Sequence, residues 1–292
     1  MSDYKIVELT CGLGNQMFQY AFAKALQKHL QVPILLDKTW FDIKENETQF
    51  SLDIFPIDLE YAKNYQIEQA KAKITKLPGF LRKIFGIKKH RIAYSQSFDF
   101  HEEYLLPNDF MYFSGFFQNP KYFKEIDSCL RQTFVYNPSN FSNSAKKRLE
   151  KIMQANNSVF IHIRRGDYCK LGWELNMNYY EKAVRYILEH VENPTFFIFG
   201  ATDNVFAEQF KIDGVSFENL GEQIIEISNQ HEDMFLMRYC KHAIIANSSY
   251  SFWSAYLNDK KDSIVIAPTP WLLGSDDIIC EHWIKINTEE KR

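Results

Sequence analysis

The opening of the chain contains two short apolar runs separated by a helical pattern. Residues 5–9 and 32–36 have the length and apolar character of buried strands. Between them, over residues 16–29, apolar side chains recur every three or four positions, which predicts a helix with one buried face. The chain therefore begins as a strand, a helix and a second strand, which is a typical start of an α/β fold.

A similar alternation fills the second half of the chain. Residues 142–153 predict a helix, after which strands and helices follow one another. The predicted strands are 159–163, 195–199, 243–246 and 263–267, and the predicted helices are 178–190, 231–240 and 249–257. This order is typical of a doubly wound parallel sheet. We therefore expect an α/β protein with two facing Rossmann-like domains, residues 1–155 and 156–292, and a ligand cleft between them.

The middle of the chain, from about residue 40 to residue 130, is irregular and rich in aromatic residues. Within it, residues 110–113 are predicted as a strand. Aromatic faces stack well on sugars, so this region is a candidate for shaping a site for a glycan.

The composition narrows the class of protein. The chain has 292 residues, of which 46% are hydrophobic, enough for two ordinary domains. A net charge of -3 gives no indication of nucleic-acid binding. The five cysteines are an odd number without a C-x-x-C pair, as expected for reduced thiols. A strand follows the initial methionine almost directly, and no apolar run has membrane-spanning length, so we expect a cytoplasmic protein.

One segment is strongly basic, although the chain as a whole has a small negative net charge. Between residues 71 and 91 there are eight Lys or Arg and no Asp or Glu, interleaved with Phe80, Leu81, Ile84 and Phe85. Such a stretch is either an amphipathic segment that contacts a membrane surface or a partner, or a solvated helical hairpin with basic faces. The first interpretation would make the protein peripheral on the inner face of the membrane.

The predicted strand 159–163 leads directly into two arginines. His162 lies within the strand, and Arg164, Arg165, a glycine and Asp167 follow it. Guanidinium groups suit phosphate binding because they donate paired hydrogen bonds. Ligands of open α/β sheets bind outside the carboxyl ends of the strands, where these arginines are expected. The alternative is structural: the arginines pair with surface carboxylates, and His162 is a hydrogen-bonded core residue.

A glycine-rich turn follows the first predicted strand. Gly12 and Gly14 would let a ligand approach the backbone, and Asn15 and Gln16 begin the next helix, whose N-terminus attracts anions. The third glycine of a dinucleotide fingerprint is replaced by Met17, and the lysine of a P-loop is also missing. Nicotinamide binding and ATP hydrolysis are therefore disfavoured. A tight turn without a ligand is the alternative.

Two later strand ends and one helix add polar candidates. Asn247, Ser248 and Ser249 follow a strand and open a helix, which makes either a phosphate seat or an ordinary N-cap. Asp233 suits the two adjacent donors of a guanine edge, or is an acid favoured by a helix N-terminus. Asp203 follows the strand 195–199 and either reaches a ligand or forms an Asx turn.

The sequence lacks D-x-D pairs and clusters with metal-ligand spacing. A departing diphosphate would then be neutralised by Arg164, helix amides and hydroxyls, so no metal and no cofactor is expected. A G-x-S-x-G elbow is also missing, which disfavours a serine hydrolase.

Three of these segments resemble the motifs of the family 11 glycosyltransferases, the α-1,2-fucosyltransferases. Residues 12–21 resemble the family's N-terminal motif, residues 162–168 its H-x-R-R-G-D-Y donor motif, and residues 247–257 its N-S-S/T-F-S-W-W-A-A-Y-L motif. The resemblance implies a GT-B fold, an acceptor-side first domain and a second domain that binds GDP-β-L-fucose. It also implies inversion at the anomeric carbon without an essential metal, and transfer to the 2-hydroxyl of a terminal galactose, as in O-antigen or other glycan biosynthesis.

The resemblance also implies roles for individual residues. Arg164 would hold the β-phosphate, Asp233 would lie at the guanine edge, and Ser248 and Ser249 would lie near the phosphates. Asn15 and the glycine turn would face the cleft. The family's S-D-D motif reads Ala-Thr-Asp-Asn around Asp203, and Tyr250 and Phe252 replace other aromatic residues.

Three residues are candidates for the catalytic base. Asp167 is the first choice, with Glu174 and His162 as alternatives, and Asp167 could instead only orient an arginine. The competing functions are a non-catalytic module that binds a sugar nucleotide and a transferase for another nucleotide sugar. The acceptor glycan and the oligomeric state stay open.

Overall fold

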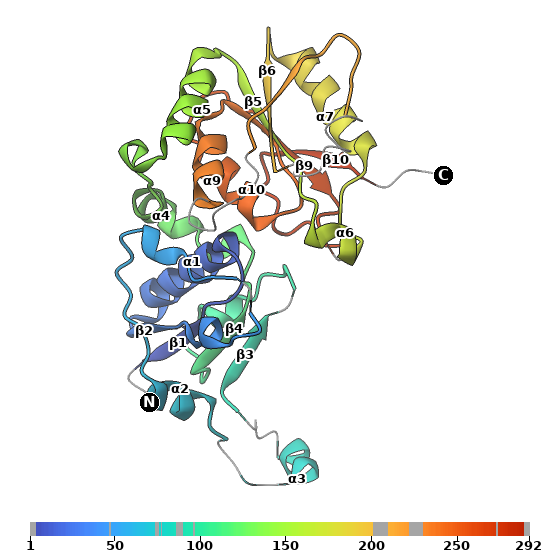
Figure 1. Ribbon diagram of the computed structural model, residues 1–292. Helices are drawn as coiled ribbons and strands as arrows, with labels where there is room; N and C mark the ends of the chain where they lie inside the picture. Colours follow the sequence, from blue (N-terminus) through green and yellow to red (C-terminus); the bar gives the residue numbers. More distant parts are fainter. Residues whose placement is uncertain are drawn as a thin grey trace. The chain divides into compact units, whose positions relative to one another are not determined.

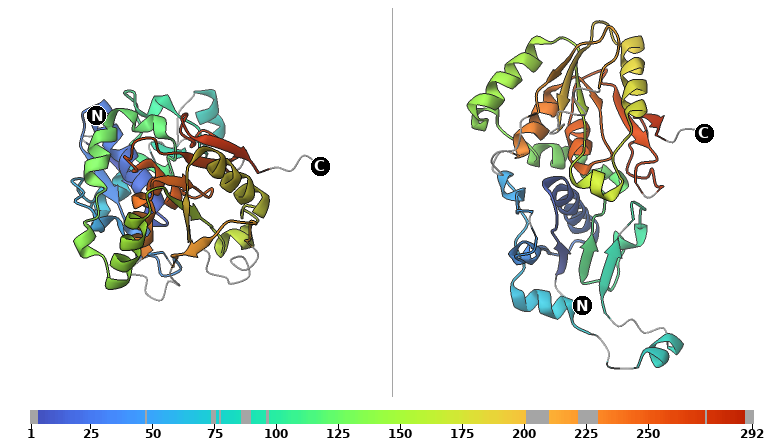
Figure 2. Two further views of the ribbon diagram at one scale, coloured as in Figure 1. Left: turned by 90° about the horizontal axis from the view of Figure 1, so that it is seen from above. Right: turned by 45° about the vertical axis from the view of Figure 1, so that its right-hand side comes forward.

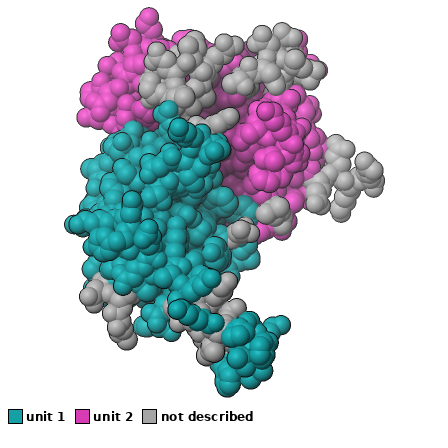
Figure 3. Space-filling model, turned by 60° about the horizontal axis from the view of Figure 1, so that its bottom comes forward, with its two compact units in different colours: residues 1–135 teal, residues 136–292 magenta. Residues whose placement is uncertain are grey.

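The computed structural model describes residues 4–46, 48–73, 76, 78–85, 90–95, 97–200, 210–221, 230–272 and 274–288. The chain divides into two compact units, Met1–Val135 and Tyr136–Arg292 (Figures 1 and 3). Each unit has its own parallel sheet, which confirms the predicted α/β class with two domains.

The division falls earlier in the chain than residue 155, where we expected it. The reason is helix α5 (Asn143–Gln154), which packs within the second unit. Ser142, its N-cap, binds the carboxylate of Glu232 through its backbone N–H at 2.6 Å and its hydroxyl at 2.8 Å. The helix therefore belongs to the second unit and is not the end of the first.

The first unit is built on a four-stranded sheet in the order β2-β1-β4-β3, with every neighbouring pair parallel. Its strands are β1 (Lys5–Glu8), β2 (Ile34–Asp37), β3 (Ile92–Ser95) and β4 (Tyr112–Gly115). Its α-helices are α1 (Leu13–Leu30), α2 (Asn64–Lys71), α3 (Gly79–Ile84) and α4 (Asp127–Thr133). Short 3₁₀ helices cover Thr39–Asp42, Leu52–Ile54, Glu102–Tyr104, Pro120–Tyr122 and Lys124–Ile126.

Aromatic residues form much of the core of the first unit. The ring of Phe22 on α1 stacks on Phe117 with centroids 3.9 Å apart, and Phe113 and Tyr122 meet the same ring edge-on. Many aromatic residues of the irregular region are therefore used for packing against α1.

The second unit is built on a six-stranded sheet in the order β10-β9-β8-β5-β6-β7, again parallel throughout. Its strands are β5 (Ser158–His162), β6 (Thr195–Phe199), β7 (Phe217–Asn219), β8 (His242–Ile244), β9 (Val265–Thr269) and β10 (Ile284–Asn287). Its other α-helices are α6 (Asp167–Leu171), α7 (Met177–His190), α9 (Gln230–Tyr239) and α10 (Ser249–Tyr256), with a 3₁₀ helix at Pro138–Asn140. Helix α7 covers one face of the sheet, and α5, α9 and α10 lie on the other (Figures 1 and 2).

Three observed strands were not predicted, and all three lie at a sheet edge. β3, β7 and β10 are three of the four outer strands, and each is only partly buried, whereas the fourth, β2, is fully buried and was predicted. An edge strand is covered less completely than an interior strand, so its sequence carries fewer apolar residues. β5, an interior strand, is buried along its whole length and was predicted within a residue.

The strand order places a topological switch point between β5 and β8. From β5 the chain moves outward to β6 and β7, and from β8 it moves outward to β9 and β10. β5 and β8 are hydrogen-bonded neighbours, with Val159 opposite His242 and Ile161 opposite Ile244. Ligands of open α/β sheets bind outside the carboxyl ends of the strands at such a point.

Among the described residues, no helix has both the length and the apolar character needed to cross a membrane. The five cysteines carry free thiols.

Candidate active site

The turn after β5 brings Arg164 and Asp167 together. Gly166 has φ +64° and ψ −111°, a conformation that side chains strongly disfavour. This reversal lets α6 begin at Asp167, whose two carboxylate oxygens lie 2.9 and 3.0 Å from Nη2 of Arg164. The side chains are 41% and 58% exposed, so the ion pair is accessible from solvent.

Tyr168 supports this arginine and connects two strand ends. Its ring centroid lies 5.1 Å from the guanidinium carbon of Arg164, within the range of a cation–π contact. Its hydroxyl donates a hydrogen bond of 3.2 Å to the backbone oxygen of Asn247, which follows β8. Burial raises the pKa of Tyr168, which keeps the phenol protonated as a donor.

The end of β8 leads into the N-terminus of α10. Asn247 and Ser248 are buried, and Ser249 is half-buried at the first position of the helix. The hydroxyl of Ser248 accepts a long hydrogen bond of 3.4 Å from the backbone N–H of Tyr250. The Asn247 side chain donates to the backbone oxygen of Trp173 at 2.9 Å. The N-cap predicted here is therefore present, beside the turn that carries Arg164.

Three buried polar atoms at this switch point make no hydrogen bond within the described part of the chain. They are Nε of Arg164, Nδ1 of His162 and Oδ1 of Asn247. Nearly all buried polar groups in folded proteins are hydrogen-bonded, so such a cluster needs a reason. A polar ligand bound at the ends of β5 and β8 would supply partners for donors and acceptors of this kind.

His162 is poorly suited to be a general base. It is only 4% exposed, and burial, with a smaller effect of the nearby Arg164 charge, lowers its pKa to about 3. Its ring lies 5.7 Å from that of Tyr250, and a Cβ built on Gly200 would lie 3.1 Å from two ring atoms. A base needs access to the acceptor and a pKa near the working pH, and His162 has neither.

Asp233 is held by a residue that the sequence analysis did not single out. Asp233 lies in the first turn of α9, and its Oδ1 is 2.5 Å from Nη1 of Arg148 on α5. The same nitrogen of Arg148 donates a hydrogen bond of 2.8 Å to the backbone oxygen of Leu220. The side chain of Asp233 is still 21% exposed. Arg148 shares the buried face of α5 with Ala145 and Ile152, and a charge on an apolar face could have identified it.

The remaining candidates of the second unit are less informative. Glu174 is exposed in the loop between α6 and α7, and Arg165 is half-buried beside Arg164. Asp203 lies outside the described residues.

The glycine turn of the first unit contains one structural residue that we expected to bind substrate. Gln16 has no exposed surface. Its amide nitrogen donates to the backbone oxygens of Cys11 and Gln49 at 2.7 and 3.2 Å, and its amide oxygen accepts from the backbone N–H groups of Ser51 and Leu52 at 2.9 and 3.1 Å. The expectation for Gln16 is therefore corrected: its side chain ties a loop to α1 and is not available to a ligand.

The other candidates of this turn, Gly12, Gly14 and Asn15, range from exposed to buried. Oδ1 of Asn15 accepts a hydrogen bond of 2.6 Å from Gln118, just after β4, and Asn15 is half-buried. Gly14 is buried. Gly12 is exposed with φ −69°, and a Cβ added there would meet no atom within 4 Å. Neither conformation nor packing therefore demands a glycine at position 12.

Among the described residues, no group of three or more His, Cys, Asp or Glu side chains is arranged to hold a metal ion.

The chain is similar to known glycosyltransferases over nearly its whole length. The family described as "Glycosyl transferase family 11" matches residues 6–287. An alpha-1,2-colitosyltransferase of Escherichia coli is 32% identical over 96% of this chain and 98% of its own. The O-antigen biosynthesis glycosyltransferase WbnK of Escherichia coli is also 32% identical, over 95% of this chain and 99% of its own.

Solved structures resemble the fold at lower identity. Arabidopsis thaliana FUT1, a mutant in complex with GDP, superimposes with a TM-score of 0.53 at 10% identity, covering 91% of this chain and 70% of that chain. The fucosyltransferase NodZ from Bradyrhizobium gives a TM-score of 0.51 at 12% identity, covering 87% of this chain and 93% of that chain. The two units therefore have the GT-B type of fold.

Proposed function

We propose a donor, an acceptor and a mechanism for this chain, which belongs to glycosyl transferase family 11 and is a glycosyltransferase. In this proposal it transfers L-fucose from GDP-β-L-fucose to the 2-hydroxyl of a terminal galactose, with inversion at the anomeric carbon. The proposal rests mainly on Arg164, whose side chain is 41% exposed and is held by Asp167 and Tyr168 at the switch point of the second unit.

The leaving diphosphate determines what this site must do. When the bond between the fucosyl carbon and the phosphate oxygen breaks, negative charge develops on GDP, and Arg164 offers a fixed positive charge. The N-terminus of α10 adds backbone N–H groups and the hydroxyls of Ser248 and Ser249. We propose that these groups neutralise the leaving group without an essential metal. Transfer that survives excess EDTA would support this, and transfer that stops in EDTA and returns with a divalent ion would contradict it.

Asp167 is our choice for the base that takes the proton of the acceptor hydroxyl. It is an exposed carboxylate at the first position of α6, three residues after Arg164. Its contact with Arg164 also supports a purely orienting role, and kinetics separate the two. A base is expected to affect kcat, and an orienting residue mainly the KM for the donor. Transfer by Asp167→Asn with an intact kcat would exclude Asp167 as the base, and Glu174→Gln is the matched test of the alternative.

In this proposal Asp233 recognises the guanine of the GDP donor. Its carboxylate can accept two hydrogen bonds from the guanine edge, and Arg148 fixes its position from α5. Calorimetry should therefore find GDP bound more tightly than UDP. Asp233→Asn, which keeps the volume but not the paired acceptors, should reduce that preference.

A second candidate donor is the GDP-activated form of colitose, the 3-deoxy analogue of L-fucose. The observation that favours it is the 32% identity with an alpha-1,2-colitosyltransferase over nearly the whole chain. The two donors differ by one hydroxyl, so a competition between them at equal concentration decides between the two candidates.

The test of the function as a whole is an acceptor screen. The purified chain is incubated with GDP-β-L-fucose and glycans that end in galactose, and NMR identifies the new linkage. The expected product carries fucose in α-configuration on O2 of galactose. A chain that binds the donor but gives neither transfer nor hydrolysis with any acceptor would be a non-catalytic sugar-nucleotide-binding module.

A further inference from the structure

The most exposed large apolar side chains of the described chain occur together on one short segment. Ile84 is 70% exposed, Phe85 66% and Phe80 65%, and no other large apolar side chain among the described residues exceeds them. All three belong to helix α3 or its C-cap. Such clustering requires an explanation, because single exposed apolar residues are ordinary but contiguous ones mark an interaction site.

The apolar residues of α3 lie on one side of the helix. Phe80 and Ile84 are four residues apart, and Leu81 and Phe85 repeat the same spacing one position later. Residues at this spacing are neighbours on a helix surface. Lys83 lies between Leu81 and Ile84 in the sequence and is also exposed. The segment is therefore amphipathic, with its apolar side open to solvent.

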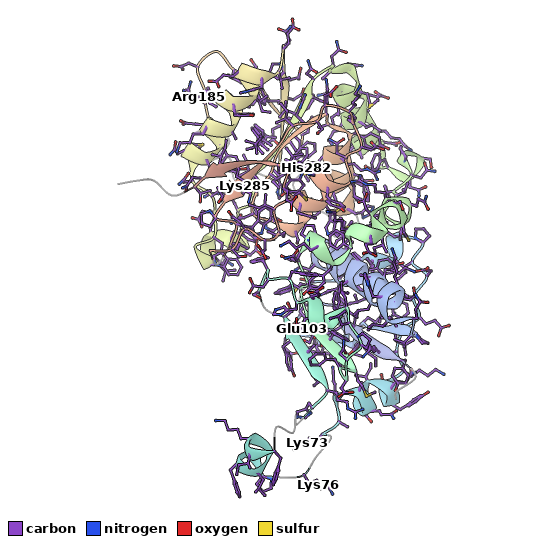
Figure 4. All side chains as sticks on the ribbon, turned by 180° about the vertical axis from the view of Figure 1, so that it is seen from behind. Lys73, Lys76, Glu103, Arg185, His282 and Lys285 are labelled. Atoms are coloured by element: carbon purple, nitrogen blue, oxygen red, sulfur yellow. The ribbon has the colours of Figure 1, made fainter. Side chains whose placement is uncertain are left out.

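The charge around this segment has one sign. No Asp or Glu occurs in the sequence between Glu68 and Asp99, whereas eight Lys or Arg occur between residues 71 and 91. Lys73 and Lys76, on the connection that precedes α3, are exposed and are labelled in Figure 4. The segment thus combines aromatic and aliphatic side chains with positive charge, although the chain as a whole has a net charge of -3.

We propose that the α3 segment, defined as Lys73, Lys76 and residues 78–85, docks the protein onto an anionic membrane surface. Phe80, Ile84 and Phe85 enter the boundary between headgroups and acyl chains, and Lys73, Lys76 and Lys83 lie at the level of the anionic headgroups. Positive charge and exposed apolar side chains are the two requirements for reversible binding to such a surface, and this segment supplies both.

The size of the segment favours a membrane over a protein partner. A helix of six residues is only about 9 Å long, whereas a stable protein–protein interface buries about 800 Å² on each partner. Membrane docking has no such requirement, because several inserted side chains and a few nearby lysines are sufficient for reversible attachment.

The experiment is co-sedimentation of the full chain with vesicles. One set is phosphatidylcholine alone, and the other contains about one third phosphatidylglycerol. We expect binding to the anionic vesicles that is strongly reduced in about 0.5 M salt, because screening shortens the range of the lysine charges. Equal binding to both sets, or no binding to either, would overturn the proposal.

Two groups of variants test the two components. The apolar variant carries Phe80→Ser, Ile84→Ser and Phe85→Ser, and the charge variant carries Lys73→Glu, Lys76→Glu and Lys83→Glu. Each should bind anionic vesicles at least about tenfold more weakly than the wild type. The altered side chains are exposed, so an unchanged unfolding midpoint and unchanged transfer to a soluble acceptor are expected.

Matched controls change the same chemistry elsewhere. They are Met153→Ser with Leu188→Ser, and Lys146→Glu with Lys147→Glu and Lys211→Glu, all at exposed positions of the second unit. These controls should bind as the wild type does. If they lose as much binding as the α3 variants, attachment is non-specific and the proposal fails. If the wild type is a dimer and the apolar variant a monomer in sedimentation velocity, α3 contacts a second copy and the membrane assignment is wrong.

Discussion

Two segments that connect an interior strand to a helix, Gly12–Gln16 after β1 and Arg164–Asp167 after β5, differ in how their polar groups are used. In the first, Gln16 is fully buried and forms four hydrogen bonds with its own unit. In the second, Arg164 and Asp167 are substantially exposed and mainly contact one another.

This difference separates Gln16, a structural side chain, from Arg164 and Asp167, whose side chains are accessible to a ligand. Both turns lie at the carboxyl end of a parallel strand, where ligands bind in folds of this type. Position alone is therefore insufficient evidence. A polar side chain can bind a ligand only if it is accessible and its hydrogen-bonding groups are not already satisfied by the protein.

The largest expected effect is that of Arg164→Ala on catalysis. Removal of the guanidinium should reduce kcat/KM by a hundredfold or more, roughly 3 kcal/mol of transition-state stabilisation, with little change in the unfolding midpoint. Steady-state kinetics with GDP-fucose measure it. Arg185→Ala, at an exposed position on α7 labelled in Figure 4, is the control and should behave as the wild type. Near-native turnover by Arg164→Ala would remove the distinction between the two turns.

The opposite result is expected for Gln16→Ala. It should lower the free energy of unfolding by about 2–4 kcal/mol, because the backbone N–H groups of Ser51 and Leu52 lose their acceptor. Urea denaturation measures this loss. Folded Gln16→Ala should retain kcat/KM within a few-fold, and a variant with native stability and no activity would show instead that the turn after β1 binds substrate through Gln16.

His162 should make stability depend on pH. Its folded-state pKa of about 3 lies below the ordinary value of 6.5, so below pH 6.5 the unfolded chain binds a proton that the folded chain does not. The stability that this histidine confers is therefore complete above pH 6.5 and is lost as the pH falls towards 3. Between pH 8 and pH 5 the loss should be roughly 2 kcal/mol.

Urea denaturation of His162→Gln isolates this contribution. The variant should lose less stability than the wild type over the same pH range. His242, whose pKa burial and nearby lysines lower to about 4, contributes in the same direction and persists in the variant. An identical pH dependence in both proteins would show that His162 is not held neutral.

The smallest expected effect is that of Gly12→Ala, and Gly166→Ala is its matched comparison. A Cβ would have open space at both Gly12 and Gly166, but only Gly166 has a positive φ. Gly166→Ala should cost about 1–3 kcal/mol of strain and reduce activity by displacing Asp167. Gly12→Ala should leave the unfolding midpoint unchanged and lower kcat/KM only if a ligand approaches this turn, as we expect. If Gly12→Ala affects neither quantity, no ligand approaches the backbone at Gly12.

Sequence patterns predicted the interior of both sheets well, since β1, β5, β6 and β8 are short, continuous runs of mostly buried residues. Edge strands such as β7 and β10 were not predicted because their partial burial leaves no clear apolar pattern. The domain boundary was placed too late because nothing in the local pattern of α5 indicates which unit it packs against.

Residue types placed Arg164 and Ser248 at the correct strand ends, but they did not distinguish Gln16 from a ligand-binding residue. That distinction depends on hydrogen bonds to Gln49, Ser51 and Leu52, more than thirty residues away in the chain. The pairing of Arg148 with Asp233 likewise joins α5 to α9, and although a charge on the apolar face of α5 marks Arg148, no local pattern identifies its partner.

The most direct test of the site is calorimetry with GDP and with guanosine, which lacks the diphosphate. If Arg164 binds the diphosphate, Arg164→Ala should weaken GDP binding at least about tenfold and leave guanosine binding unchanged, since a charged hydrogen bond is worth about 1.5–3 kcal/mol. GDP binding by Arg164→Ala as tight as that of the wild type would contradict the assignment of the β5–β8 switch point as the diphosphate site.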